Sequence, residues 1–410
     1  MRNLMILLFL AFFLTAQPVL SETTITWWQF WTDPTIKPVI SSMVDEFEKA
    51  NPDIQVELTD LTWANGHEKI AIAFASGTGP DIVELGSDWM AQFAANDRLA
   101  DITDQVVEDT ADYDGWSMAT YNGRIYGRPW ILGTRVMFMN NELIKRTDHF
   151  TMDFLPLGWN QLKVAAQKIT ALGDDVYGWG SNTAEKHRLY KKFLPFFWSA
   201  GAQVFTDDGK YCIIASEPAV DALKFYKMLH DSCGYVGNQR DIEDAFLEGK
   251  VGFIFSGDWL LKRIKQENHD IDFQTSLIPG QEFNEFRITG QSFMGGEILT
   301  VNAASENKEA AIKFVEFITS PENQLRFCKA NGSANPSSRT AQQDEYFQSD
   351  PNLQTFITQI KHAKHPPVDP DWVYIERELE KAVERVLFED AGPGEALLEA
   401  RDNIVALRGE

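Results

Sequence analysis

The sequence predicts an α/β protein of roughly two or three domains. The 410 residues are 44% hydrophobic and 24% charged, the balance of a water-soluble globular chain that is too long for one ordinary core. Short β-like runs alternate with helical patterns of about 10–15 residues. This order is typical of a largely parallel sheet that is covered by helices on both faces.

The alternation begins directly after the N-terminal segment. Residues 24–30 are β-like and aromatic, and the apolar residues between 36 and 47 recur at helical spacing until Asn51-Pro52-Asp53 ends the helix. In chain order, a strand, a helix, a strand and the start of a further helix follow, at residues 54–58, 64–76 and 81–85 and from Ser87-Asp88.

The same alternation resumes in the rest of the chain. After Arg135 we expect a strand that ends at Asn140. The later helices are expected at residues 159–172, 217–232, 241–248, 306–319 and 371–389. No internal repeat and no long linker interrupts this pattern.

The charge balance argues against nucleic acid as a partner. The formal net charge is −23, from 60 acidic and 37 basic residues, and such a surface repels phosphate unless a local basic stripe exists. The densest basic clusters are Lys191-Lys192 and Lys262-Arg263, and both are short. The chain also contains 12 Trp, an excess that is the first indication of function.

Residues 1–21 have the pattern of a cleaved secretory signal peptide. A short positive start at Arg2 precedes the apolar run 4–16, and small residues occupy the −3 and −1 positions before Glu22. A membrane anchor is the alternative, but the run is shorter than the ~20 residues that span a bilayer. No Cys lies near the cleavage site, so we expect a protein of the periplasm rather than a lipoprotein.

Export permits disulfides, and the chain has three Cys. Cys212 lies in a β-like run and Cys233 closes a helical stretch, so the two could meet, and the sequence leaves open whether they form a disulfide or stay buried thiols. Cys328 is typical of a core residue. No Cys or His spacing indicates a zinc site, and we expect no metal and no cofactor.

Three partial enzyme motifs are each broken. His67-Glu68 lacks the second His of a zinc-protease motif at Ala71, and Gly77-Thr78-Gly79 lacks the third Gly of a dinucleotide loop at Ile82. Gly290-Gln291-Ser292-Phe293 is followed by Met294, where a nucleophile elbow has its final Gly. A glycosidase needs only two carboxylates, which can lie far apart in sequence, so that class stays open.

Five stretches of the chain occur in an order that is informative when they are taken together. The first two are Ile25-Thr26-Trp27-Trp28-Gln29-Phe30-Trp31 and Ala75-Ser76-Gly77-Thr78-Gly79-Pro80-Asp81. The others are Tyr126-Gly127-Arg128-Pro129-Trp130, then Gly249-Lys250-Val251-Gly252-Phe253 with Gly257-Asp258-Trp259, then Gly295-Gly296 with Asn302-Ala303-Ala304-Ser305. In this order across residues 25–330 they resemble one family, the extracellular solute-binding proteins of bacterial ABC importers, in the sugar-binding group that includes maltose-binding protein. The last 80 residues match loosely.

The resemblance implies a type II periplasmic-binding-protein fold: two α/β lobes, each a mostly parallel sheet flanked by helices, with a ligand cleft between them. The chain would cross between lobes near 131–135, 294–299 and 335. The N-terminal lobe would then comprise 22–132 with 297–335, and the C-terminal lobe 133–296 with 336–410. Open α/β sheets bind ligands beyond the carboxyl ends of their strands, which agrees with this placement.

A sugar needs flat aromatic rings for its C–H faces and planar polar groups for its hydroxyls. Trp28 and Trp31 are candidates at the end of the first strand. Strand alternation places Trp28 on the same face as Phe30. For each Trp the alternative is packing in the core. By resemblance Asp88 accepts sugar hydroxyls, although it could instead cap a helix. Glu84 could act in the same way.

The remaining candidates come from both expected lobes. Arg135, at the first crossing, would donate to ligand or form an interlobe salt bridge. By resemblance Trp259 stacks on the ligand, Gly295-Gly296 bring backbone N–H groups close to it, and Trp372 is a further aromatic contact. Trp63 could line the cleft from a loop. Each of these has a structural alternative, either core packing or, for the two Gly, a bulge.

The resemblance therefore implies a periplasmic receptor of an ABC sugar importer, without catalysis, that captures a mono- or oligosaccharide by hinge closure. Its partners would be the sugar and the permease subunits, and the protein would be a monomer. Two alternatives stay open: a secreted glycoside-active enzyme, and a receptor of the same fold for another solute such as a polyamine, whose cationic groups could stack on Trp.

Overall fold

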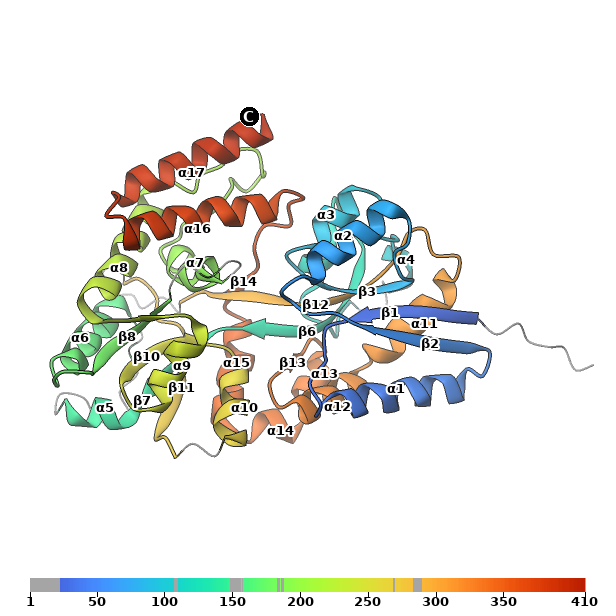
Figure 1. Ribbon diagram of the computed structural model, residues 1–410, viewed down its shortest axis with the longest axis horizontal. Coiled ribbons are helices and arrows are strands. Elements are labelled where there is room, and N and C mark those ends of the chain that lie inside the picture. Colours follow the sequence, from blue (N-terminus) through green and yellow to red (C-terminus); the bar gives the residue numbers. More distant parts are fainter. Residues whose placement is uncertain are drawn as a thin grey trace, which may run out of the picture.

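The computed structural model describes residues 23–106, 110–147, 156, 158–182, 185, 188–267, 270–282 and 290–409. The proposed signal peptide, residues 1–21, lies outside these ranges. Two separate sheets, each covered by helices, lie side by side along the long axis of the molecule (Figure 1). The predicted fold class, two α/β lobes, is confirmed.

The first sheet combines a parallel and an antiparallel part. Its strands, in spatial order, are β13 (Asn335–Pro336), β6 (Gly127–Thr134), β12 (Ser292–Val301), β3 (Ile82–Gly86), β1 (Thr23–Gln29) and β2 (Ile54–Asp60). β1 is parallel to β2 and β3, whereas β12 is antiparallel to β3 and β6. A short strand, β14 (Ala363–Lys364), pairs with the start of β12. The parallel part brings the carboxyl ends of β1 and β3 to the same edge.

The second sheet has the same mixed character. Its strands, in spatial order, are β11 (Phe273–Ser276), β7 (Val136–Asn140), β10 (Val251–Ser256), β8 (Tyr177–Asn182) and β9 (Gly234–Gly237). β8 is parallel to β9 and β10, and β7 is antiparallel to β10 and β11. Apart from the short β14, which is parallel to β12, each sheet is parallel over three strands and antiparallel beyond them, which is less parallel than the sequence suggested.

Helices cover both sheets. Those that pack with the first sheet are α1 (Lys37–Ala50), α2 (Gly66–Ser76), α3 (Met90–Ala95), α11 (Lys308–Ile318) and α12 (Pro321–Asn331). Those that pack with the second are α5 (Asn141–Arg146), α6 (Trp159–Thr170), α7 (Leu189–Ser199), α8 (Glu217–Cys233), α9 (Gln239–Leu247), α10 (Trp259–Gln266), α16 (Trp372–Phe388) and α17 (Pro393–Arg408). The shorter elements are α4 (Thr103–Val106), the 3₁₀ turn Trp116–Ala119, β4 (Thr120–Tyr121), β5 (Arg124–Ile125), α13 (Arg339–Gln342) and α14 (Glu345–Gln348). None of the described helices is both long and apolar enough to cross a bilayer.

The chain passes between the sheets close to the expected positions. β6 ends at Thr134 in the first sheet and β7 begins at Val136 in the second, while β12 leads back and pairs Met294 with Thr134. The helix α15 (Pro351–Ile360) contacts both parts, because Phe356 packs with the second sheet and Ile357 with the first. The exact lobe boundaries given above stay a prediction.

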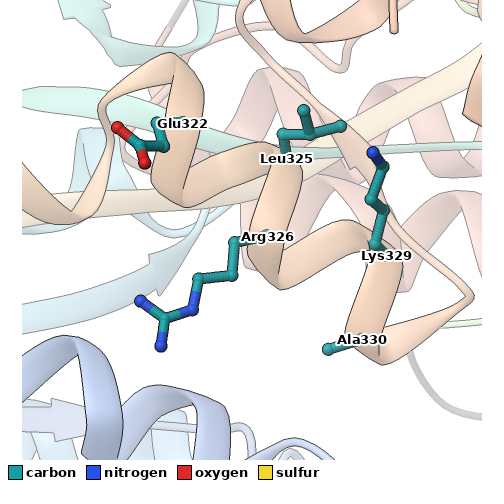
Figure 2. Close-up of a pocket in the computed structure, with 5 residues that line it drawn as sticks. All are labelled: Glu322, Leu325, Arg326, Lys329 and Ala330. Atoms are coloured by element: carbon teal, nitrogen blue, oxygen red, sulfur yellow. The ribbon is translucent and has the colours of Figure 1, made fainter. Parts of the chain in front are cut away.

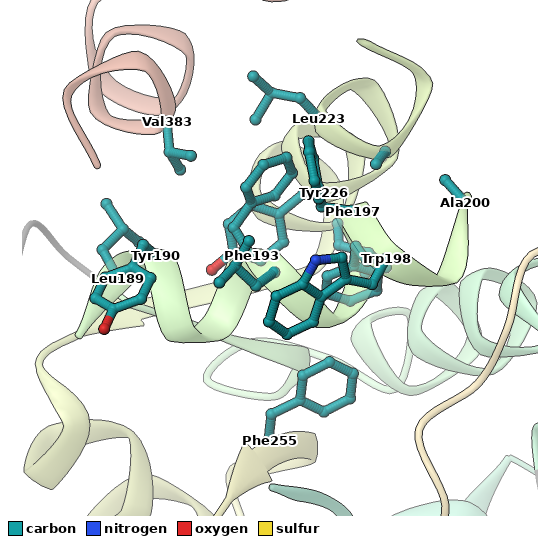
Figure 3. Close-up of a cluster of buried hydrophobic side chains, with 14 of the residues drawn as sticks. Leu189, Tyr190, Phe193, Phe197, Trp198, Ala200, Leu223, Tyr226, Phe255 and Val383 are labelled. Carbon is teal, nitrogen blue, oxygen red and sulfur yellow. The ribbon is translucent and has the colours of Figure 1, made fainter. Parts of the chain in front are cut away.

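The largest apolar core lies in the second lobe, around α7. This helix is buried on nearly all sides, and its aromatic residues pack against α8, α16 and the sheet (Figure 3). Phe196, for example, stacks on Phe255 of β10 with ring centroids 5.1 Å apart. This packing fixes the position of α7 relative to the second sheet.

Two local expectations need correction. Cys212 forms only an isolated β-bridge with Phe205 rather than lying in a strand, while Cys233 ends α8. The structure has no bond between them: both are buried thiols in the core of the second lobe, as Cys328 is in the first. The helix expected from Ser87-Asp88 begins at Met90, because residues 87–89 form a turn.

Candidate functional site

Aromatic side chains gather at the carboxyl ends of β1 and β3. Phe30 follows β1 and stacks on Trp63 with ring centroids 4.1 Å apart and an angle of 16°. Trp89, just after β3, packs against both rings. Phe30 and Trp89 are buried, whereas Trp63 remains 46% exposed, so one large ring is open to solvent here.

Trp28 and Trp31 lie on opposite faces of the first sheet. Trp28 is half-buried and packs with the cluster that contains Phe30, as strand alternation predicted. Trp31 packs with the opposite cluster, edge-on to Trp130 and Phe327. The two Trp therefore cannot contact one small ligand from the same face of the sheet.

Asp88 lies in the turn after β3 and makes contact with the other lobe. Its Oδ2 accepts hydrogen bonds from the Tyr190 hydroxyl and from Lys191 Nζ, each at 3.2 Å. Burial would raise the pKa of Asp88, but the Lys191 ammonium and the hydrogen bonds at the carboxylate outweigh it and lower this pKa from its usual value. Asp88 is not a side-chain cap for α3, whose N-terminus has none.

Arg135 and Trp259 pack together on the side of the second lobe. The Arg135 guanidinium lies over the Trp259 ring, 4.5 Å from its centroid, and 5.7 Å from that of Phe293. Trp259 Nε1 donates to Glu243 Oε1 at 2.7 Å, which fixes the orientation of the indole. Arg135 has no ion pair with a described residue, and burial lowers its pKa to about 10.

Two carboxyl groups lie near the crossing strands that join these walls. Asp258 Oδ2 accepts a hydrogen bond of 2.6 Å from Asn335 Nδ2 on β13. Burial raises the pKa of Asp258 to about 7 even though Arg135 favours its ionised form. Burial raises the pKa of Glu297 on β12 to about 8, and the negative charge of Asp258 adds to this shift. The base of the site thus carries carboxyl groups that hold protons near neutral pH.

Gly295 and Gly296 on β12 are explained by packing. A Cβ on Gly296 would lie 2.4 Å from the carbonyl oxygen of Ile131 on the neighbouring strand, and one on Gly295 would lie 2.8 Å from the Phe293 ring. The Gly296 carbonyl accepts the Ser87 N–H at 2.8 Å. Both glycines therefore let the crossing strands approach closely beside the turn that carries Asp88.

Glu84 and Trp372 are buried rather than open to a ligand. Glu84 is fully buried on β3, where Oε2 accepts the Phe30 N–H at 2.9 Å, and burial raises its pKa well above the usual value. Trp372 is 1% exposed and packs edge-on behind Tyr190. Both residues lie behind the site in this structure, and a direct contact of either with a ligand stays a prediction.

We use the term interlobe site for seven side chains that the structure brings into this region from both lobes. They are Trp63, Asp88, Arg135, Tyr190, Lys191, Trp259 and Phe293. Sequence reasoning missed Tyr190, Lys191 and Phe293. The Lys191-Lys192 pair had been noted only as a basic cluster, and nothing in its spacing indicated that it faces Asp88.

Two other features do not belong to this site. No group of three or more potential metal-ligating side chains is found among the described residues. A shallow hollow runs along α12, lined by Glu322, Leu325, Arg326, Lys329 and Ala330 (Figure 2). Arg326 in this hollow bonds Glu46 of α1 at 2.8 Å, so the hollow lies on the outer surface of the first lobe.

The interlobe site offers an exposed aromatic ring, a carboxylate acceptor and cationic donors, contributed by two lobes between which β6–β7 and β12 carry the chain. This combination is typical of a two-lobed protein that binds a small molecule between its lobes. The family comparison agrees. Residues 33–325 match the model of the bacterial extracellular solute-binding proteins, and the chain belongs to that family.

The individual relatives share low sequence identity with this chain. The chain is 24% identical to a putative binding protein of Brucella abortus (strain 2308), over 88% of each chain. It is 22% identical to the maltotriose-binding protein of Pyrococcus abyssi, over 85% of this chain and 74% of that one. The solved structure of the sugar-binding protein MalE from Xanthomonas citri has a TM-score of 0.81 and 25% identity, and covers 94% of this chain and 98% of its own.

Proposed function

We propose that this chain is the substrate-binding receptor of an ABC sugar importer. It would capture a mono- or oligosaccharide between its lobes by hinge closure and deliver it to permease subunits in the membrane. The signal peptide would direct the protein to the periplasm and be removed there. The receptor would work as a monomer and without a cofactor.

The observation that carries this proposal is the half-exposed Trp63 ring on the same wall as Asp88. A sugar ring stacks its C–H face on an indole and places its hydroxyls on charged acceptors and donors. Asp88 supplies the acceptor, and Arg135 and Lys191 of the second lobe supply donors. A ligand held by both sets would contact both lobes and so favour their closure.

The relatives support the same ligand class. Two proteins similar to this chain are a maltotriose-binding protein and a maltodextrin-binding protein of Bacillus subtilis, and the structural neighbour from Xanthomonas citri is a sugar-binding protein. We propose that Trp63, Asp88, Arg135 and Trp259 contact the sugar, with Trp28 or Trp31 at its edge. The Gly295-Gly296 backbone would lie at the floor of the site.

The test is calorimetric titration of the mature chain with glucose, maltose, maltotriose, cellobiose and xylobiose. At least one sugar should bind with a stoichiometry of one, and chromatography should recover it unchanged. Steady release of shorter sugars in proportion to protein would instead show a glycoside-active enzyme. Absence of binding across a wide sugar panel would contradict the proposal.

A polyamine receptor is the second candidate, because several carboxyl groups lie in the region. Asp88, Asp258 and Glu297 lie near enough to affect each other's charge, and Arg135 and Lys191 are cations beside them. Putrescine and spermidine therefore belong in the same titration series. Binding of spermidine without binding of any sugar would favour this candidate.

A further inference from the structure

The contact between Asp88 and α7 joins the two lobes directly. Asp88 belongs to the turn after β3 in the first sheet, whereas Tyr190 and Lys191 are 102 and 103 residues further along the chain. The core of the second lobe holds α7 rigidly in place (Figure 3). Movement of one lobe away from the other must therefore break both hydrogen bonds.

The two bonds are shielded from water. The side chains of Lys191 and Asp88 are 21% and 11% exposed. The Lys191 ammonium also lies 5.2 Å from the centre of the Phe293 ring and 5.4 Å from that of Tyr190, where the rings favour a cation. Because screening is weaker away from bulk water, this ion pair stabilises the closed arrangement more than a typical surface pair.

A second interlobe ion pair lies elsewhere. Lys262 Nζ of α10 contacts Asp33 Oδ2 of the first lobe at 3.2 Å, and it also donates to Asn331. The Asp33 side chain is 43% exposed, and none of these three residues belongs to the interlobe site. Of these two pairs, only the one at Asp88 uses an acceptor that a ligand between the lobes would need.

We propose that Tyr190 and Lys191 form an interlobe clasp on Asp88, which holds the lobes closed in the absence of ligand and which an incoming ligand must displace. Asp88 Oδ2 already accepts two hydrogen bonds, one for each of its lone pairs, so a ligand hydroxyl can reach this oxygen only when Tyr190 or Lys191 leaves it. The clasp thus makes Lys191 a residue that sets the affinity and association rate of the site, because it sets the population of the open form.

The clasp predicts a specific behaviour of the ligand-free protein. Removing the ammonium should shift the lobes toward the open form, and removing the carboxylate charge should do the same. Since the two groups act on each other, the two changes should not add when combined. A change in a salt bridge that does not join the lobes should have no such effect.

The experiment measures the lobe-to-lobe distance in the full mature chain without ligand. Fluorophores attached at Lys69→Cys on α2 and Lys224→Cys on α8 report the distance by energy transfer, and the three native Cys are buried. Lys191→Met should raise the open-to-closed ratio roughly tenfold, the loss expected for a hydrogen bond to a charged group. Lys191→Arg should restore much of the closed population.

Two further variants complete the test. Asp88→Asn should open the protein to a similar extent, and Asp88→Asn with Lys191→Met should open it no further than either alone. Lys145→Met, which breaks a salt bridge with Asp272 inside the second lobe, is the matched control and should leave the distance unchanged.

The proposal of a clasp would be wrong if the ligand-free wild-type protein is already open. It would also be wrong if the Lys191→Met protein is as closed as the wild type. Fully additive effects of the two changes would contradict it as well. Because no ligand is used, these outcomes are separate from the test of sugar binding. A receptor that binds sugar and is open without it would keep the proposed function and lose the clasp.

Discussion

The aromatic side chains of the first lobe include buried core residues and one ring that is partly exposed to solvent. Trp27 is fully buried between Trp130 and Phe314 and forms part of the core. Trp63 stacks on Phe30 by one face and remains 46% exposed. The indole of Trp63 can therefore bind a ligand without any rearrangement of the core.

Replacing Trp63 with Ala tests its role as a stacking surface. Full burial of a large apolar side chain contributes about 1.5–3 kcal/mol, so losing the open part of this ring should weaken sugar binding roughly tenfold. The melting temperature should fall only slightly, because the ring is half-exposed. Tyr211→Ala, which removes a 64% exposed ring from the second lobe, is the control in the same calorimetric series. Equal affinity of the Trp63→Ala and wild-type proteins would place the binding surface elsewhere.

The carboxyl groups at the base of the site predict how stability depends on pH. Burial raises the pKa of Glu297 from its usual 4.5 to about 8. Between these values the folded chain holds a proton that the unfolded chain has released, so stability should fall as pH rises from about 4.5 to 8. Asp258, whose pKa is raised from 3.8 to about 7, acts in the same direction over a lower range. Asp88 and Lys191 also face Glu297, with opposite effects on its charge.

Glu297→Gln should remove part of this pH dependence, because the amide resembles the neutral acid and cannot ionise. Urea denaturation at pH 5 and pH 8 should show that the variant loses less stability on going to pH 8 than the wild type does. Glu57→Gln on the exposed side of β2 is the control. If wild type and Glu297→Gln lose equal stability over this range, Glu297 is not the group that holds the proton.

The sequence could predict a residue's position where one local rule determines it. Strand alternation placed Trp28 on the side of Phe30, and the turn after β3 placed Asp88 at the sheet edge. It could not predict that Trp372 lies behind Tyr190, because that contact joins elements 182 residues apart and depends on how α16 packs. Nor could it reveal that Asp88 has partners on α7.

At the scale of elements, several helices with one apolar face were predicted, whereas the buried helix α7 and others such as α15 and α17 were missed. α1, α8, α11 and α16 each present a buried stripe and a polar face, and their observed bounds lie close to the expected ones. α7 is buried over ten of its eleven residues and has Pro195 in its interior, a residue that usually ends or kinks a helix. The one residue that is not buried is Lys191, which explains why the missed helix carried the missed contact.

The crossing strands give a prediction about elements. Gly296→Ala would place a Cβ 2.4 Å from the Ile131 carbonyl oxygen, and backbone cannot move aside as a flexible side chain can. Overpacking of this kind costs about 1–3 kcal/mol. The variant should therefore unfold at lower urea concentration and bind sugar more weakly.

Gly133→Ala on the neighbouring strand β6 is the matched control. Its Cβ would meet only the Gly295 carbonyl oxygen at 4.0 Å, which is ordinary contact. This substitution should keep wild-type stability or raise it slightly, because Ala restricts the unfolded chain. Equal stability of Gly296→Ala and Gly133→Ala would show that the crossing strands are not closely packed at Gly296.

At the scale of the whole molecule, two sheets are joined where the chain passes between them and by direct contacts between the lobes. The alternation of strands and helices predicted the α/β class, whereas the two lobes and the crossings between them were implied by the family resemblance. The arrangement of the lobes depends on pairs such as Asp88–Lys191 and Asp33–Lys262, which no local pattern reveals. In such a molecule, breaking a single ion pair can change the overall shape.

Small-angle scattering with and without the sugar that binds best should show how the ligand and the Asp88–Lys191 ion pair change the overall shape. A ligand that contacts both lobes favours the closed form, so its effect on the radius of gyration depends on how much open form exists beforehand. The wild-type protein, held closed by the clasp, should change little. Lys191→Met should be larger without ligand and become as compact as the wild type at saturation, because the ligand then supplies the bridge that Lys191 no longer provides. A Lys191→Met protein that binds the sugar in calorimetry and keeps an unchanged, expanded radius would show that binding does not close the lobes.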